Sequence, residues 1–200
     1  TMPNPEVVLA IIRQESEFDS KANSWAGARG MMQLMKYTAK IVAKQAKLPY
    51  SISRLTRDPE YNIKLGSYYF NSLIEDYRGV YPFAIAAYNA GPNRVKTWRR
   101  VNGDPSKGKL SYVNWIELIR FKETRNYVQR VLENINVYKY MLSKEPVKID
   151  ILNKNSQKYI NISLKPFMGV TMSKGTVCNL NFPKNSLIMQ IETDDVDLDI

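Results

Sequence analysis

The sequence has no histidine and a single cysteine, and these two absences exclude several kinds of chemistry. Without histidine, a Ser-His-Asp triad, a Cys-His pair, a His-ligated metal and an imidazole proton shuttle are all impossible. Cys178 alone cannot close a disulfide within the chain, and a cysteine-based zinc site would need several more thiols. Proton transfer near neutral pH must therefore use carboxylates, lysine, tyrosine or the lone thiol.

The chain also lacks a long apolar run. No window approaches ~18 uninterrupted apolar residues, and the beginning of the chain lacks the basic, apolar and small-residue regions of a secretory signal. We therefore expect no integral membrane segment and no signal peptide in this chain. Its 200 residues, 44% of them hydrophobic, suffice for one good-sized core or for one domain of about 140 residues with a small companion, but not for two large domains.

Acidic residues are scarce in the front part of the chain. Residues 1–144 carry 23 basic and 12 acidic side chains, a net charge of +11, whereas residues 145–200 have a net charge of −1. This balance predicts an anionic partner for the front part, which could be a nucleic acid, a membrane surface or an acidic polymer. The lysines at helical spacing, Lys36, Lys40, Lys44 and Lys47, are interpreted as a solvated helix face.

Proline, glycine and apolar spacing predict helices throughout this front part. Asn4 offers an N-cap before Pro5, and the apolar stripe that follows predicts a helix from Pro5 to about Ser16. The segment from Met31 to Met35 is predicted to be a short buried helical turn. Further helices are predicted from Thr38 to about Lys47, after Asp58-Pro59, from Pro82 to Gly91, from Pro92 through Trp98 and from Thr124 to Leu142, with a loop over Asn102–Lys109.

Beyond Pro146 the apolar period changes from helical to alternating. Val147–Ile151 and Tyr159–Leu164 predict a hairpin, and Leu187–Ile191 predicts a further strand. We therefore expect a mainly α fold, with a helical domain over residues 1–145 and a small β-rich C-terminal appendage with an acidic tail over residues 146–200.

Glu15 breaks the apolar pattern of the first helix. It lies four residues after Ile11 and three after Ile12, so it continues the apolar stripe and should face the interior or a cleft wall. Loss of hydration there would raise the pKa of its carboxyl and keep a proton available near neutral pH, as a general acid needs. Spacing alone leaves two other interpretations open: a side chain turned to solvent, or one paired with an arginine.

Four segments around these residues occur in a distinctive order. They are Arg13–Phe18, Gly27–Met35 with Ser24 and Thr38, Ala86–Pro92 with Arg94, Val95 and Trp98, and Phe121–Leu132. Together they resemble the catalytic domain of soluble lytic murein transglycosylases, the lysozyme-like family that cleaves peptidoglycan, over about residues 5–142. The chain departs from the family pattern at Met31, where the family commonly has leucine, and at Lys36, where it commonly has proline.

The resemblance implies a lysozyme-like helical domain in which Glu15 is the sole catalytic acid and base. The sugar groove would be lined by Ser24, Gln33, Met35, Tyr88, Asn89 and Tyr127, with Glu123 beneath it. Each of these seven residues also has a purely structural interpretation: loop or backbone hydrogen bonding for Ser24 and Gln33, core packing for Met35 and Tyr88, a helix C-cap for Asn89, and anchoring of the last helix for Glu123 and Tyr127.

The resemblance further implies a peptidoglycan lytic transglycosylase. Such an enzyme cleaves the β-1,4 bond between N-acetylmuramic acid and N-acetylglucosamine, and the sugar's own C6 hydroxyl closes a 1,6-anhydro ring. No metal or cofactor is required. The alternatives are a goose-type lysozyme-like hydrolase and a non-catalytic domain that binds anionic polymers.

The implied partners are peptidoglycan glycan strands, in the periplasm or cell envelope. Nucleic acid is not expected, because the sequence has no Gly-rich phosphate loop and no aromatic RNA-binding motif. A protein partner for the appendage stays open.

Overall fold

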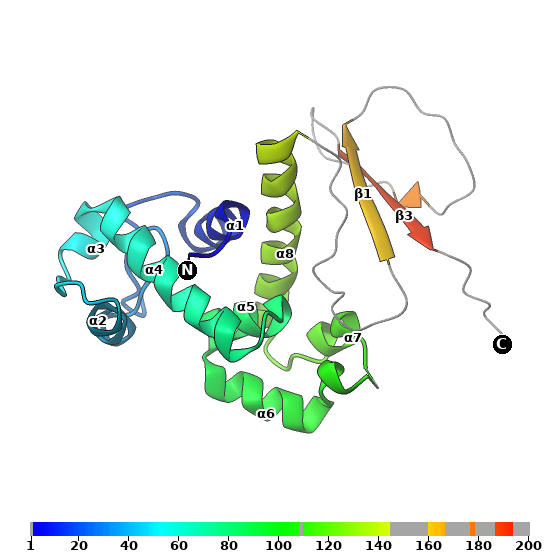
Figure 1. Ribbon diagram of the computed structural model, residues 1–200, viewed down its shortest axis with the longest axis horizontal. Helices are drawn as coiled ribbons and strands as arrows, with labels where there is room; N and C mark the ends of the chain where they lie inside the picture. The colour runs from blue at the N-terminus through cyan, green and yellow to red at the C-terminus, as the bar shows by residue number, and fades with distance from the viewer. Residues whose placement is uncertain (1, 109, 145–159, 167–176, 179–186, 194–200) are drawn as a thin grey trace.

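The computed structural model describes residues 2–108, 110–144, 160–166, 177–178 and 187–193 (Figure 1). Over these residues the fold is mainly helical, as predicted. None of the described helices combines the length and the apolar content needed to cross a bilayer. The helices are α1 (Pro5–Ser16), α2 (Lys36–Gln45), α3 (Arg54–Arg57), α4 (Pro59–Asp76), α5 (Tyr81–Ala90), α6 (Pro92–Asn102), the short 3₁₀ helix η1 (Pro105–Lys107), α7 (Tyr112–Glu117) and α8 (Lys122–Ser143).

Prolines mark the helix starts that the sequence predicted. Pro5, Pro59 and Pro92 each occupy the first position of a helix, where the missing N–H costs no hydrogen bond. Before α4, the Asp58 carboxylate accepts a 3.0 Å hydrogen bond from the Tyr61 backbone N–H, as an N-cap does. The prediction of a cap-plus-proline start is therefore confirmed for α4.

The main core lies where α8 packs against α1 and α5. Val128, Val131 and Ile135 of α8 are buried there together with Ile11 and Ile12 of α1. The same core continues into an aromatic cluster in which the Phe83 ring lies 4.7 Å from the Trp115 ring in edge-to-face contact. Figure 1 shows α8 standing at the centre, with α1 beside it and α5, α6 and α7 around its lower end.

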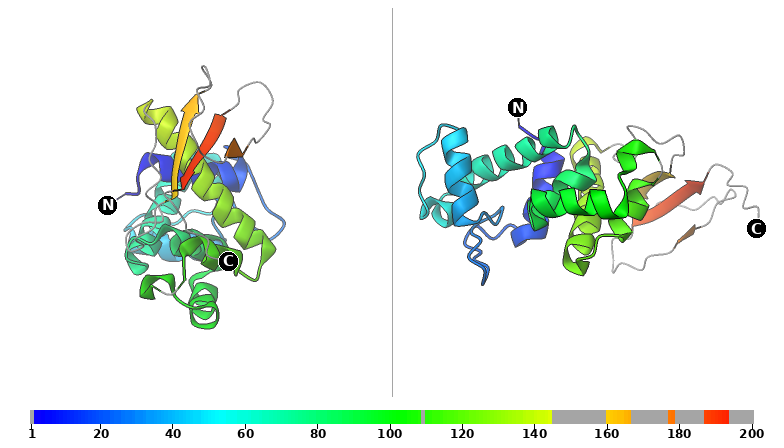
Figure 2. Two further views of the ribbon diagram at one scale, coloured as in Figure 1. Left: turned by 90° about the vertical axis from the view of Figure 1, so that its right-hand side faces the viewer. Right: turned by 90° about the horizontal axis from the view of Figure 1, so that it is seen from below.

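A second, smaller core holds one end of the helical domain together. It consists of buried side chains from α2, α3 and α4 and from the loop before α2, among them Leu34, Val42, Leu55 and Leu65. Figure 1 shows α2 and α3 at one side of the molecule, with the long helix α4 running from α3 toward α5, and the view from below in Figure 2 shows the same separation from α8. We call residues 20–57, which include α2 and α3, the α2–α3 lobe.

Two details of this lobe correct the sequence predictions. Residues 30–33 form turns with Gln33 at a φ of 46°, and Met35 is exposed, so the predicted helical turn is wrong, although Met32 and Leu34 are buried as predicted. The paired backbones of Arg29 and Leu34 hold this segment as a tight bend instead. Helix α2 begins at Lys36, so Thr38 lies inside its first turn and does not cap it.

Three strands are described after α8. Strand β1 (Ile160–Pro166) pairs antiparallel with β3 (Leu187–Thr193), and β2 (Val177–Cys178) pairs with the other edge of β3. The predicted strand over Val147–Ile151 lies outside the described residues. The small β-rich appendage stays a prediction, because most of residues 146–200 lie outside the described part.

Candidate active site

A pocket of about 270 Å³ opens where the end of α1 meets α5 and the beginning of α8. Three helices that are far apart in the sequence thus meet at one site. The residues that line it are Gln14 and Glu15 of α1, Asn89 of α5, and Glu123, Asn126, Tyr127 and Arg130 of α8.

Glu15 is directed into this pocket by the packing of α1. Val7, Ala10, Ile11 and Ile12 form the buried face of the helix, and the side chain one turn after Ile11 falls on that face. The helix then stops, because Glu17 at a φ of 52° and Phe18 at 71° adopt left-handed backbone conformations. Glu15 thus lies partly buried in the last turn of α1, on its buried face.

The surroundings of Glu15 bring the pKa of its carboxyl into the neutral range. Burial raises the pKa of Glu15 from its ordinary 4.5 to about 7, because the charged form loses hydration. The hydroxyl of Tyr127 donates a 2.6 Å hydrogen bond to Oε1 of Glu15, which lowers this pKa, and the nearby negative charge of Glu123 raises it. The raised pKa is the property that a general acid requires.

The structure answers the alternatives that spacing had left open for Glu15. The side chain lines the pocket with a tyrosine hydroxyl as its partner, and none of the ion pairs among the described residues involves it. The nearby Arg13 approaches Glu17 instead, at 4.0 Å. Glu15 is therefore neither turned to solvent nor paired with an arginine among the described residues.

Tyr88 and Asn89 lie in the last turn of α5 and make different contacts. Asn89 lines the pocket, and its Oδ1 accepts a 2.7 Å hydrogen bond from the Thr124 hydroxyl of α8. Tyr88 does not line the pocket but lies close enough to Glu15 for the two groups to interact electrostatically; its hydroxyl donates to the Met32 carbonyl at 2.8 Å and its ring contacts Phe70. Tyr88 thus fixes the loop before α2, whereas Asn89 presents a polar group to the site.

Ser24 and Gln33 act within the loop between α1 and α2. The Ser24 hydroxyl oxygen accepts from the Ala28 backbone N–H at 3.0 Å, and Gln33 Nε2 donates to the carbonyls of Gly30 at 2.9 Å and Ala22 at 3.2 Å. These are the structural contacts that the sequence had offered as alternatives. Ser24, Gln33, Met35 and Tyr88 do not line the pocket, and Met35 is 44% exposed.

One buried amide connects this loop to α4. Oδ1 of Asn62 accepts from the Met32 backbone N–H at 2.8 Å, and its Nδ2 donates to the carbonyls of Arg29 at 2.9 Å and Leu55 at 3.0 Å. Asn62 is fully buried, and its bonds to Met32 and Leu55 are shielded from water, whereas the bond to Arg29 is partly buried. Gly66, one turn later, lets Met32 pack directly on the α4 backbone, since a Cβ there would lie 2.7 Å from the Met32 Cβ.

Sequence reasoning missed three of the residues that line the pocket. Gln14 precedes Glu15, and Asn126 and Arg130 lie on the same face of α8 as Tyr127. A signal for the last two was present, because Glu123, Asn126 and Arg130 recur at helical spacing as a polar stripe beside the apolar one. Gln14 had no signal apart from its neighbour.

The helical part of the chain is similar to proteins of known structure and activity. Residues 2–111 match the family model of the Transglycosylase SLT domain. The Soluble lytic murein transglycosylase of Escherichia coli K12 is 40% identical over 139 residues, which are 69% of this chain and 21% of that protein. The chain thus spans about a fifth of the length of the curated relative.

Two solved structures are similar over the same region. One is the 70 kDa soluble lytic transglycosylase from Escherichia coli, with a TM-score of 0.65 and 39% identity over 71% of this chain and 23% of that chain. The other is an inactive Glu-to-Gln mutant of the lytic transglycosylase Slt from Pseudomonas aeruginosa, with a TM-score of 0.64 and 39% identity over 70% of this chain and 22% of that chain. The resemblance drawn from the four sequence segments is therefore confirmed.

Proposed function

Because this chain belongs to the SLT transglycosylase family, we propose that it is a peptidoglycan lytic transglycosylase with Glu15 as its only catalytic acid and base. It would cleave the β-1,4 bond between N-acetylmuramic acid and N-acetylglucosamine and release a 1,6-anhydromuramoyl product. The observation that carries this proposal is the partly buried Glu15 carboxyl, whose pKa of about 7 supplies a proton inside a pocket.

In the first step the Glu15 carboxyl protonates the glycosidic oxygen, so that the leaving sugar departs as an alcohol. The resulting carboxylate then accepts the proton of the C6 hydroxyl as that oxygen attacks the anomeric carbon. An intramolecular hydroxyl held in place reacts in preference to water through its high effective molarity. The reaction thus returns Glu15 to its protonated form without a second carboxyl as nucleophile.

Two neighbours of Glu15 would support both of these states. The Tyr127 hydroxyl stabilises the carboxylate that exists between the two steps, because its hydrogen bond favours the charged form. Glu123 has the opposite effect and favours the protonated form before the first step. We assign Asn89 to sugar binding from the pocket wall, and Ser24, Gln33, Met35 and Tyr88 to the groove beyond the pocket.

The reaction class is tested by the mass of the products. Purified, lipid-free cell-wall sacculi are digested with the protein, and the released fragments are analysed by mass spectrometry from the first minutes. We expect fragments that end in an anhydro sugar and are about 18 Da lighter than the hydrolysed species. Reducing ends at early times would indicate a goose-type hydrolase, and binding without release would indicate a non-catalytic domain.

The domain organisation and location belong to the same proposal. Residues 1–145 would form the catalytic domain, and residues 146–200 a small β-rich appendage that is available for a protein partner. The substrate places the protein in the periplasm or cell envelope. A basic front part is suited to this setting, since muramyl groups and uncrosslinked stem peptides give peptidoglycan a negative charge.

A further inference from the structure

The α2–α3 lobe contains cations but no acidic side chain. Between Asp19 and Asp58 the sequence has no aspartate or glutamate. The proposed catalytic chemistry uses none of the cations in this interval. They are Lys21, Arg29, Lys36, Lys40, Lys44, Lys47, Arg54 and Arg57.

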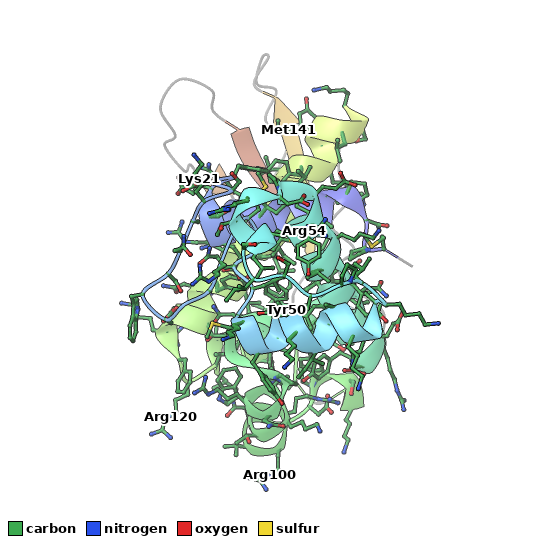
Figure 3. The ribbon with its side chains drawn as sticks, turned by 90° about the vertical axis from the view of Figure 1, so that its left-hand side faces the viewer. Lys21, Tyr50, Arg54, Arg100, Arg120 and Met141 are labelled. Atoms are coloured by element: carbon green, nitrogen blue, oxygen red, sulfur yellow. The ribbon has the colours of Figure 1, made fainter. Side chains whose placement is uncertain are left out.

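Helix α2 gathers part of this charge on one exposed face. Its opposite face is buried through Ala39, Val42 and Ala43, which fixes how the helix is turned. We define the α2 face as Lys36, Tyr37, Lys40, Ile41 and Lys44, which are all exposed. Figure 3 shows the molecule from this side, with α2 crossing the middle of the view and Lys21 and Arg54 above it.

An exposed apolar pair separates the α2 face from an ordinary solvated lysine face. The ion pairs among the described residues include no lysine at all, so pairing does not distinguish this face from other lysines there. Between the lysines, Tyr37 is 76% exposed and Ile41 is 40% exposed, one turn apart on the same side of the helix. Solvation alone gives no reason for an exposed aromatic and aliphatic pair here.

The α2 face is also remote from the pocket. Figure 1 and Figure 2 both show α2 at the far end of the helical domain from α8, which contributes four of the pocket residues. A ligand bound at Glu15 would therefore leave this face free.

We propose that the α2 face docks the protein on the surface of an anionic phospholipid bilayer. Lysines bind the negatively charged headgroups, while tyrosine and isoleucine enter the boundary between the headgroups and the acyl chains. A soluble polyanion would use the lysines but would gain nothing from Tyr37 and Ile41. The combination of clustered lysines, in a sequence interval without acidic residues, with exposed apolar side chains therefore favours a lipid surface over an acidic polymer.

The test is co-sedimentation of the full chain with vesicles. We expect binding to vesicles of equal parts phosphatidylglycerol and phosphatidylcholine, and at least tenfold weaker binding to pure phosphatidylcholine. The double variant K40E/K44E should lose at least tenfold in binding, because each lysine near an anionic surface contributes about a fivefold factor. Raising the salt concentration should weaken binding of the unmodified protein as well.

A matched control has the same charge change elsewhere. Lys96 and Arg100 are also exposed and four residues apart, on α6, and Figure 3 shows Arg100 at the lower end of the molecule, away from α2. The variant K96E/R100E should bind the vesicles within about twofold of the unmodified protein. Equal losses in the two variants would reduce the effect to net charge and overturn the proposal.

The apolar pair distinguishes a bilayer from a polymer. The variant Y37S/I41S should bind vesicles several-fold more weakly but bind soluble polyglutamate as the unmodified protein does. An unchanged affinity for vesicles would show that the face only recognises charge, and the lipid proposal would fail. Thermal melting of each variant checks that it is folded.

Vesicle binding and cell-wall cleavage are measured separately. K40E/K44E should release fragments from lipid-free sacculi at the rate of the unmodified protein. A matching loss of cleavage would assign the lysines to substrate binding and overturn the proposal. Absence of cleavage by every variant would contradict the proposed function while leaving the vesicle result intact.

Discussion

The hydroxyl of Tyr127 donates a 2.6 Å hydrogen bond to Oε1 of Glu15, although the two residues are 112 positions apart in the chain. The bond connects the last turn of α1 to the second turn of α8 inside the pocket. It opposes the effect of burial on the carboxyl, which is the larger of the two. The pKa of Glu15 thus depends on the Tyr127 hydroxyl and the Glu123 charge, and each of these can be removed by a single substitution.

Replacing Glu15 by glutamine should abolish turnover and leave the fold intact. Glutamine keeps the volume of the side chain but has no transferable proton, so we expect cleavage of sacculi to fall by at least about a thousandfold. The matched control is Glu17→Gln, an exposed carboxyl two residues later, which should retain full activity. An active Glu15→Gln protein would remove Glu15 from the mechanism.

The Glu15→Gln variant should become more stable than the unmodified protein as the pH rises. Glu15 has a pKa of 4.5 when unfolded and about 7 when folded, so its proton stabilises the folded state fully below pH 4.5, and this contribution is lost as the pH rises through 7. Glutamine has no proton to lose. By pH 8 the free energy of unfolding of the Glu15→Gln variant should exceed that of the unmodified protein by about 1–3 kcal/mol. Urea denaturation of both proteins at pH 4.5 and at pH 8 measures this difference.

Activity should fall as the pH rises through about 7, because the first step needs the protonated carboxyl of Glu15. The pH dependence of kcat/KM measures this pKa in the free enzyme. A rate that stays flat from pH 4 to about 9 would contradict general-acid catalysis by this group.

Two substitutions should move the alkaline limb of that profile in opposite directions. Tyr127→Phe removes a hydrogen bond that favours the charged form, so the pKa of Glu15 should rise and the limb should move to higher pH. Glu123→Gln removes a negative charge, so the pKa should fall and the limb should move to lower pH. Shifts in the same direction would show that these contacts do not control the proton of Glu15.

Asn62→Ala should destabilise the protein more than its size suggests. The substitution leaves the Met32 N–H and the carbonyls of Arg29 and Leu55 without their partner in a buried position. We expect a loss of about 3 kcal/mol in the free energy of unfolding and a Tm lower by about 8 °C. Asn71→Ala, at a half-buried position on the same helix whose side-chain hydrogen bond is exposed, should cost less than about 1 kcal/mol.

Removal of residues 146–200 should leave an active enzyme. The buried face of α8 is covered by α1 and α5, and α8 itself ends at Ser143, so the truncation leaves the core whole. Thermal melting and release of anhydro fragments from sacculi measure the result. If the truncated protein is insoluble or inactive while the full chain works, the domain boundary at Pro146 is misplaced.

Much of the helical fold could be predicted because its signals are local. Pro5, Asp58-Pro59 and Pro92 each favour the start of the helix in which they lie. The bounds of α1 follow from Pro5 and from the apolar stripe. Glu15 could be singled out for the same reason, since its position on the stripe is a property of one helix.

The groove and the loop before α2 could not be derived in this way. The hydroxyl of Tyr88 binds the carbonyl of Met32, which is 56 residues away, and local spacing contains no information on this contact. The bend at Met31–Met35 likewise depends on Asn62 from α4 and on the Arg29–Leu34 pairing. These long-range polar contacts override the helical spacing of the three methionines.

Met32 is anchored on three sides, and this has a consequence for how the groove meets a ligand. Its N–H is bound by Asn62, its carbonyl by Tyr88, and its side chain lies against Gly66. The loop that displays Ser24 and Gln33 can move away only if contacts to α4 and α5 break together, which makes it part of a cooperative unit. Its backbone amides should exchange with solvent as slowly as those of the core helices. A sugar chain would therefore meet a preformed surface, and little conformational entropy would be lost on binding.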